Sequence, residues 1–135
     1  MRAFIVELEN RPGSMADVCE AIGAEGINVV GVAGMTWDAE GAVGLITNND
    51  SATRRLLEER EAKYREVELV AAGLEDRPGA LADAARRLAD RGVNIEAAMT
   101  TSMLGSKVTI AFGVDDAIAA REALGELANL SGASI

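Results

Sequence analysis

The sequence predicts an α+β protein made of two βαββαβ modules that follow one another in the chain. Three observations lead to this prediction: an internal repeat, alternating apolar residues at the start of each copy, and helical periodicity after a shared Pro-Gly turn. The modules would span residues 1–67 and 68–135. Each would form an antiparallel sheet covered by two helices.

The repeat is clearest when residues 9–29 are placed over residues 75–95, at a constant offset of 66 residues. Eight positions are then identical, far more than average residue usage gives by chance. The only two prolines of the chain are one of these pairs. The identical pairs are Glu9/Glu75, Arg11/Arg77, Pro12/Pro78, Gly13/Gly79, Ala16/Ala82, Asp17/Asp83, Gly26/Gly92 and Asn28/Asn94.

Each copy opens with a strand whose alternate residues are apolar, so one face should be buried. A helix with apolar residues three and four positions apart follows. The strand positions are Phe4, Val6 and Leu8, and Val70, Ala72 and Leu74. The helix positions are Met15, Val18, Cys19 and Ile22, and Leu81, Ala84, Ala85 and Leu88.

Proline and glycine mark both ends of this helix. Proline fixes a φ that suits a first helical turn, and glycine tolerates backbone angles that other residues avoid. Pro12-Gly13 and Pro78-Gly79 therefore mark the starts. Gly26 and Gly92 mark the ends, where the next apolar residue can complete a C-terminal cap.

A hairpin, a second helix and a last strand complete the module, which is the ferredoxin-like arrangement. The hairpins would cover residues 28–47 and 94–114, and the second helices would start near Asp50 and Asp116. The first module's last strand, residues 64–67, would run directly into the second module. Only residues 130–135 remain for the other last strand, so we expect it to be short or absent. The modules would pack side by side.

Composition narrows the function. The net charge of −9 opposes binding to nucleic acid or to anionic membranes, and aromatic residues are too few for an RNA-stacking sheet. No apolar run reaches the roughly 18 residues of a membrane span, and the start lacks a signal-peptide core. We therefore expect a cytoplasmic protein that binds neither nucleic acid nor membrane.

The residue set also argues against catalysis. There is no histidine, and Cys19 is the only cysteine, which indicates no disulfide, no metal site, no cofactor and no nucleophile-histidine pair. Cys19 is expected to pack in the core. A small acyl-phosphate hydrolase is the remaining catalytic alternative, but its phosphate cradle would have only Arg11 or Arg77 beside a Pro-Gly turn.

The motifs Glu-Asn-Arg-Pro-Gly-Ser-Met (9–15) and Gly-Ile-Asn-Val (26–29), with counterparts at 75–81 and 92–95, resemble the ACT domain. That family consists of small regulatory modules, commonly attached to enzymes of amino-acid metabolism. The resemblance covers essentially the whole chain. It implies paired modules with amino acids bound at their interface, through the turn after the first strand and the asparagine that opens the second.

The site that the resemblance implies comprises two sets of residues. They are Asn10, Arg11, Pro12, Gly13, Ser14, Met15, Asn28 and Val29, and Asp76, Arg77, Pro78, Gly79, Ala80, Leu81, Asn94 and Ile95. The free amides of a helix start favour a ligand carboxylate, and an acid such as Asp76 could hold its ammonium. Simpler structural roles stay open: the turn needs Pro-Gly in any case, the asparagines could satisfy backbone groups, and the arginines could pair with acids.

The sequence therefore predicts a non-catalytic, free-standing tandem ACT protein that senses a free amino acid. It would signal to an enzyme of amino-acid metabolism or through its own oligomeric state. Modules of this size favour association, so a homo-oligomer, most simply a homodimer, is expected. The alternative is a regulatory interaction subunit that binds no ligand.

Overall fold

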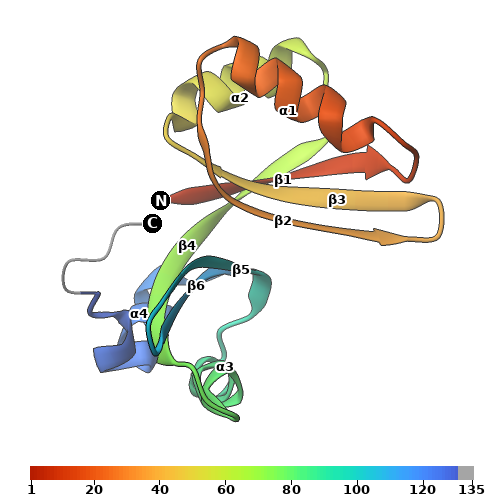
Figure 1. Ribbon diagram of the computed structural model, residues 1–135. Coiled ribbons are helices and arrows are strands. Elements are labelled where there is room, and N and C mark those ends of the chain that lie inside the picture. Colours follow the sequence, from red (N-terminus) through yellow and green to blue (C-terminus); the bar gives the residue numbers. More distant parts are fainter. Residues whose placement is uncertain (131–135) are drawn as a thin grey trace. The chain divides into compact units, whose positions relative to one another are not determined.

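The computed structural model describes residues 1–130 of the 135-residue chain. The chain divides into two compact units: Arg2–Glu66, and Met1 together with the chain from Val67 onward. Each unit contains helices and antiparallel strands, which confirms the predicted α+β class (Figure 1).

The Arg2–Glu66 unit has the strand order β2-β3-β1, with α1 and α2 on one face (Figure 1). Phe4, Val6 and Leu45 of the sheet meet Ile22 and Leu57 of the helices in its core. The elements are β1 (Arg2–Glu9), α1 (Ser14–Ala24), β2 (Val29–Trp37), β3 (Glu40–Thr47) and α2 (Asp50–Glu59).

The unit that begins at Val67 has the strand order β4-β6-β5. Its core joins Ala72 and Phe112 of the sheet to Ala84, Leu88 and Leu124 of the helices. The elements are β4 (Tyr64–Glu75), α3 (Ala80–Asp90), β5 (Ile95–Leu104), β6 (Lys107–Val114), α4 (Ala117–Leu124) and the 3-10 helix η1 (Gly125–Ala128).

The strand β4 merges two predicted strands, the last of the first module and the opening strand of the second. It runs from Tyr64 to Glu75 without a loop, as the sequence indicated. The short or absent strand expected at residues 130–135 falls on 131–135, which lie outside the described residues.

The first helix of each unit begins and ends as its glycines predict. Gly13 and Gly79 precede the helices with φ of 90° and 88°, in the left-handed region. At the ends, the Ile27 amide donates to the Ile22 carbonyl at 3.2 Å, and the Val93 amide to the Leu88 carbonyl at 3.0 Å. These six-to-one bonds are those of the Schellman cap.

The buried stripe of these helices differs from the prediction at its first position. Met15 and Leu81 were expected in the core but are 46% and 53% exposed. Ser14 and Ala80 are buried in their place. The reason is spacing: the buried residues of each helix follow one another by four positions, starting at the first helical residue (Ser14, Val18 and Ile22; Ala80, Ala84 and Leu88). Cys19 is only partly buried.

The second helices are capped by side chains. In α4 the predicted Asp116 accepts the Ala119 amide at 3.0 Å, whereas in α2 the cap is Asn49, one residue before the predicted Asp50. Asn49 accepts the Ala52 amide at 3.0 Å. Either oxygen satisfies an amide that the helix itself cannot.

An ion pair ties α2 to the beginning of β4. The Arg54 guanidinium donates to both Glu66 oxygens, at 2.8 and 2.5 Å, and lies 6.0 Å from the centre of the Phe4 ring. This bidentate pairing lowers the pKa of the Glu66 carboxyl below its ordinary value. The pair therefore stabilises the fold when Glu66 is ionised.

We predict that Glu66→Gln lowers the thermal midpoint at neutral pH but has little effect in acid. A depressed folded pKa contributes stability above the unfolded pKa, and that contribution is lost as pH falls through the folded value. Calorimetric unfolding of both proteins at pH about 7 and about 3 checks this, since an unperturbed Glu titrates near 4.3. An equal difference at the two pH values would contradict an electrostatic origin.

Candidate functional site

The strand-to-helix turns leave backbone donors open at the helix starts. Since the N-cap residues are glycines, neither α1 nor α3 has a side-chain cap. In α1 the Ser14 amide reaches the Arg11 carbonyl at 3.3 Å and the Asp17 amide reaches the Gly13 carbonyl at 2.9 Å. The intervening amides, those of residues 15 and 16, have no acceptor among the described residues. In α3 the same holds for residues 81 and 82.

The turn arginines are occupied within their own turns. Arg11 pairs with Glu9 at 3.2 Å and with Asp17 at 3.5 Å. Arg77 pairs with Asp83 at 3.1 Å. Each guanidinium also donates to the carbonyl of the following proline at 3.2 Å. These contacts match the structural alternative that the sequence left open, and they brace the Pro-Gly turn.

The first residue of the turn distinguishes the two copies. The Asn10 side-chain amide donates to the Asp38 carbonyl in the β2–β3 turn at 2.7 Å. Its counterpart Asp76 is exposed, and its carboxylate has no partner among the described residues. The second turn therefore contains an unpaired anion as well as open amide donors, whereas the first contains only the donors.

Asn28 and Asn94 open the second strands with exposed side chains that make no hydrogen bond within the described chain. Their backbone amides donate hydrogen bonds to side chains further along the chain. The Asn28 amide donates to Asn48 Oδ1 at 3.0 Å, and the Asn94 amide donates to Asp115 Oδ1 at 2.9 Å. The alternative that these asparagines satisfy nearby backbone groups is therefore wrong for their side chains. The half-buried Val29 and Ile95 follow as the first residues of β2 and β5.

Within one unit, the predicted site residues form two groups rather than one. The Pro-Gly turn stands at the start of the first helix, and the asparagine follows its end. An 11-residue helix separates them, and at 1.5 Å per residue its axis is roughly 16 Å long. A free amino acid is too short to bridge that distance, so one unit alone does not assemble the predicted site.

Two of the predicted site residues, Ser14 and Ala80, have side chains buried in the core, and only Ser14 buries a polar group there. It is 8% exposed, and its hydroxyl is the buried polar side-chain atom without a partner in the described chain. Ala80, at the equivalent place, belongs to the apolar core. A buried hydroxyl without a hydrogen bond carries an uncompensated desolvation cost.

We predict that Ser14→Ala raises the free energy of unfolding by about 1 kcal/mol, because it removes that cost. The reverse change in the other copy, Ala80→Ser, should lower it by about 1 to 3 kcal/mol. Denaturant titration of both variants measures the two values. A Ser14→Ala protein that is less stable than the parent would mean that the hydroxyl has a partner in solution.

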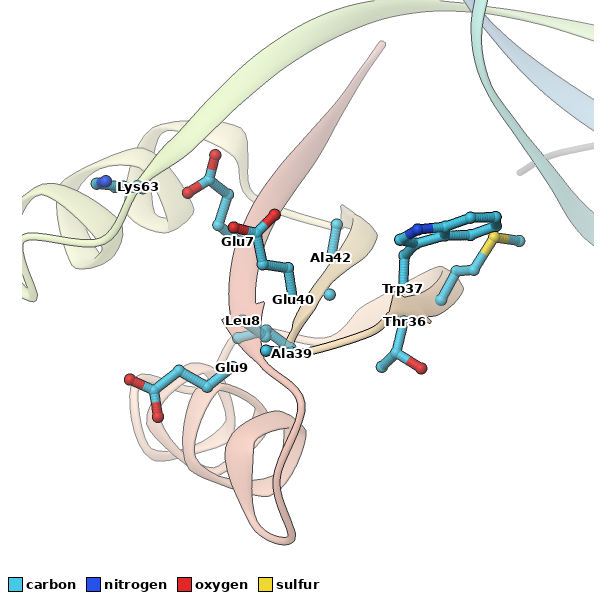
Figure 2. Close-up of a pocket in the computed structure, with 11 residues that line it drawn as sticks. Glu7, Leu8, Glu9, Thr36, Trp37, Ala39, Glu40, Ala42 and Lys63 are labelled. Carbon is cyan, nitrogen blue, oxygen red and sulfur yellow. The ribbon is translucent and has the colours of Figure 1, made fainter.

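Metal ligation, membrane spanning by a helix and surface hollows also bear on the function of the described residues. These residues contain no group of three or more His, Cys, Asp or Glu placed to hold a metal ion. No helix among them has the length and apolarity to cross a membrane. A hollow of about 650 Å³ lies beside the β2–β3 turn (Figure 2). None of the predicted site residues lines it.

Comparison with protein families identifies part of the chain. The model of the ACT domain matches residues 69–129. An ACT domain is thus present in the second half, over β4 to η1. Comparison with curated protein sequences finds no significant match.

Solved structures resemble a larger part of the chain. A protein of Bacteroides thetaiotaomicron has a TM-score of 0.76 at 21% identity, covering 93% of this chain and 86% of that one. The regulatory subunit of aspartate kinase from Thermus thermophilus has a TM-score of 0.67 at 16% sequence identity, and the match covers 93% of this chain and 90% of that one. The structure of the aspartokinase alpha and beta subunits has a TM-score of 0.67 at 22% sequence identity, and the match covers 96% of this chain and 93% of that one. Identities this low show the fold alone.

Proposed function

We propose that the chain is a non-catalytic regulatory protein that senses a free amino acid through two ACT modules, residues 1–67 and 68–135. The observation that carries the proposal is the turn before α3. There, inside the segment that matches the ACT domain, the same turn carries the unpaired Asp76 carboxylate and leads into open amides at the helix start. A free amino acid carries one charge of each sign and complements both groups.

In the proposed complex, the ligand carboxylate accepts hydrogen bonds from the amides of Leu81 and Ala82. The helix dipole favours an anion at that position, and Gly79 leaves the backbone uncovered for its approach. Asp76 binds the ammonium group. These roles go to residues that the turn itself leaves without partners.

An asparagine of another module completes this site, because the asparagine of the same module is a helix length away. We propose that Asn28 or Asn94 supplies its free side-chain amide in this way, from the sister module or from a second copy of the chain. The first turn is the weaker site, since Asn10 is committed to the Asp38 carbonyl. The full set comprises residues 10–15, 28–29, 76–81 and 94–95.

A regulatory role fits the neighbours in fold, two of which are subunits of aspartate kinase, one of them described as regulatory. By analogy, we propose that ligand binding is passed to an enzyme of amino-acid metabolism in the cytoplasm, or changes the oligomeric state of this protein. A regulatory subunit that acts by contact alone is the second candidate, and the ligand screen below separates the two.

We predict that one or a few of the twenty amino acids raise the thermal midpoint of the purified protein. A ligand at 100 times its dissociation constant adds about 2.7 kcal/mol to stability. The matching decarboxylated amine should have no effect through this site, because it lacks the group that the helix start binds. If no amino acid shifts the midpoint, the chain is better explained as an interaction subunit.

Variants of the same residues locate the site in the same measurement. Asn94→Ala and Asn28→Ala each remove one exposed amide and leave the strand pairing intact. Losing a hydrogen bond to a charged ligand group weakens affinity by about one to two decades. Calorimetric titration of the amino acid found in the screen measures this. Unchanged affinity in both variants would contradict the site, even for a true amino-acid sensor.

We further predict that the chain forms a homodimer at micromolar concentration. Modules of about 65 residues bury little surface alone, and the proposed site needs groups from two modules. Light scattering with and without the amino acid measures the mass. A monomer under both conditions would leave the sister module as the only source of the second asparagine.

A further inference from the structure

The hollow beside the β2–β3 turn lies on the sheet face turned away from α1 and α2. In β1, Phe4 and Val6 face the core, so the alternate residues Glu7 and Glu9 face the other way. The strand register aligns two rows across this face. One row is Glu9, Glu40 and Trp37, and the other is Glu7, Ala42 and Met35.

One side of the hollow is apolar and exposed. Trp37 is 81% and Met35 80% exposed, which is unusual for side chains of this size on a soluble unit. They occupy the same face of β2, two residues apart. Figure 2 shows the Trp37 ring standing at one edge of the hollow, beyond Ala42.

The other side is acidic, and its charges are incompletely balanced. Three carboxylates, those of Glu7, Glu9 and Glu40, line the hollow with the single ammonium of Lys63. Glu9 is held by Arg11 at 3.2 Å. The carboxylates of Glu7 and Glu40 have no partner among the described residues, and Figure 2 shows both side chains between Lys63 and Trp37.

The strand register concentrates negative charge at the end of this strand pair. Glu9 stands directly opposite Glu40 on the neighbouring strand. Like charges in directly opposed positions destabilise a strand pair. Arg11 offsets the Glu9 charge, whereas the Glu40 carboxylate has no counter-charge among the described residues, so a cation beside Glu40 would be favoured.

The second unit shows the same strand pair without the feature. There Glu75 stands opposite Lys107, and the two form an ion pair. Gly73 takes the place of Glu7, and Leu104 the place of Trp37. The acidic and aromatic hollow is therefore particular to the first copy and is not a requirement of the fold.

We propose that this hollow binds an organic cation, an ammonium or guanidinium group carried on a short apolar chain. The cationic group lies between the Glu7 and Glu40 carboxylates, and the chain lies against Trp37 and Met35. Charge-assisted hydrogen bonds and contact with the indole face both favour such a group. A bare metal ion fits less well, because the exposed Trp37 and Met35 side chains that line the hollow offer no oxygen ligands.

Trp37 is the only tryptophan of the chain, so intrinsic fluorescence reports directly on the hollow. The probes are agmatine and 1,5-diaminopentane, titrated into the full-length protein at constant ionic strength. Both lack the carboxylate that the proposed amino-acid site requires, so either proposal can fail alone. Neutral 1-pentanol and sodium chloride are the controls. We expect a saturable change with the amines only, weakened by added salt.

Two variants test the assignment. Glu40→Lys copies the Glu75–Lys107 pair of the second unit and should retain the fold, because it replaces a like-charge pair with an opposite-charge pair. Glu7→Gln removes the other charge while keeping the shape. Each should weaken amine binding by roughly tenfold or more, as expected for a lost charge-assisted bond.

Three results would overturn the proposal. One is a non-saturating response, and another is an equal response to sodium chloride, since either indicates general screening of a chain with net charge −9. The third is unchanged amine affinity in Glu40→Lys. The last probe is a short peptide in which an arginine is flanked by glycines. If it binds while agmatine does not, the hollow belongs to a basic protein segment and not to a free cation.

Discussion

A glycine in the left-handed region before each first helix constrains much of this molecule. At φ near 90° a side chain would be strained, so Gly13 and Gly79 can hold these positions where other residues cannot. A residue without a side chain also cannot satisfy a helix amide with a side-chain oxygen. The backbone geometry that turns the chain from strand to helix thus leaves the first amides open. The arginine that follows the strand contacts the proline carbonyl and nearby acids and stiffens the turn. The turn and the open amides thus have the same origin.

Most of the fold could be predicted because its signals are local. Alternating apolar residues, Pro-Gly turns and the Gly-apolar cap each act within a few residues, and the helices and strands that they predict are present. The error at Met15 and Leu81 has a simple cause: helical spacing fixes the buried stripe only once the first helical residue is known. A helix that starts at Ser14 or Ala80 buries that first residue in place of Met15 or Leu81 and leaves the later buried positions as predicted. This replacement places a hydroxyl in the core of one copy and a methyl group in the other.

The candidate site was less predictable, because it depends on contacts between distant residues. The bond from Asn10 to the Asp38 carbonyl joins residues 28 apart, and nothing near Asn10 indicates it. The side chains of Asn48 and Asp115 accept hydrogen bonds from the strand-opening amides, but the constant offset of the repeat does not pair these two residues. The reason is that β5 has an extra residue, with a register shift near Ser102. That insertion changes the offset between copies from 66 to 67. The opposed carboxylates of Glu9 and Glu40 likewise become neighbours only through strand register.

The uninterrupted strand β4 also determines how this chain can be divided. Its residues up to Glu66 belong to one compact unit and those from Val67 to the other, so the boundary falls inside a strand and not in a loop. A protease would find no exposed linker at the junction, and a truncation there would leave a severed strand with unsatisfied backbone groups. Exchanging one half for that of a homologue would carry the same penalty. The two units therefore cannot be separated by a simple cut between elements.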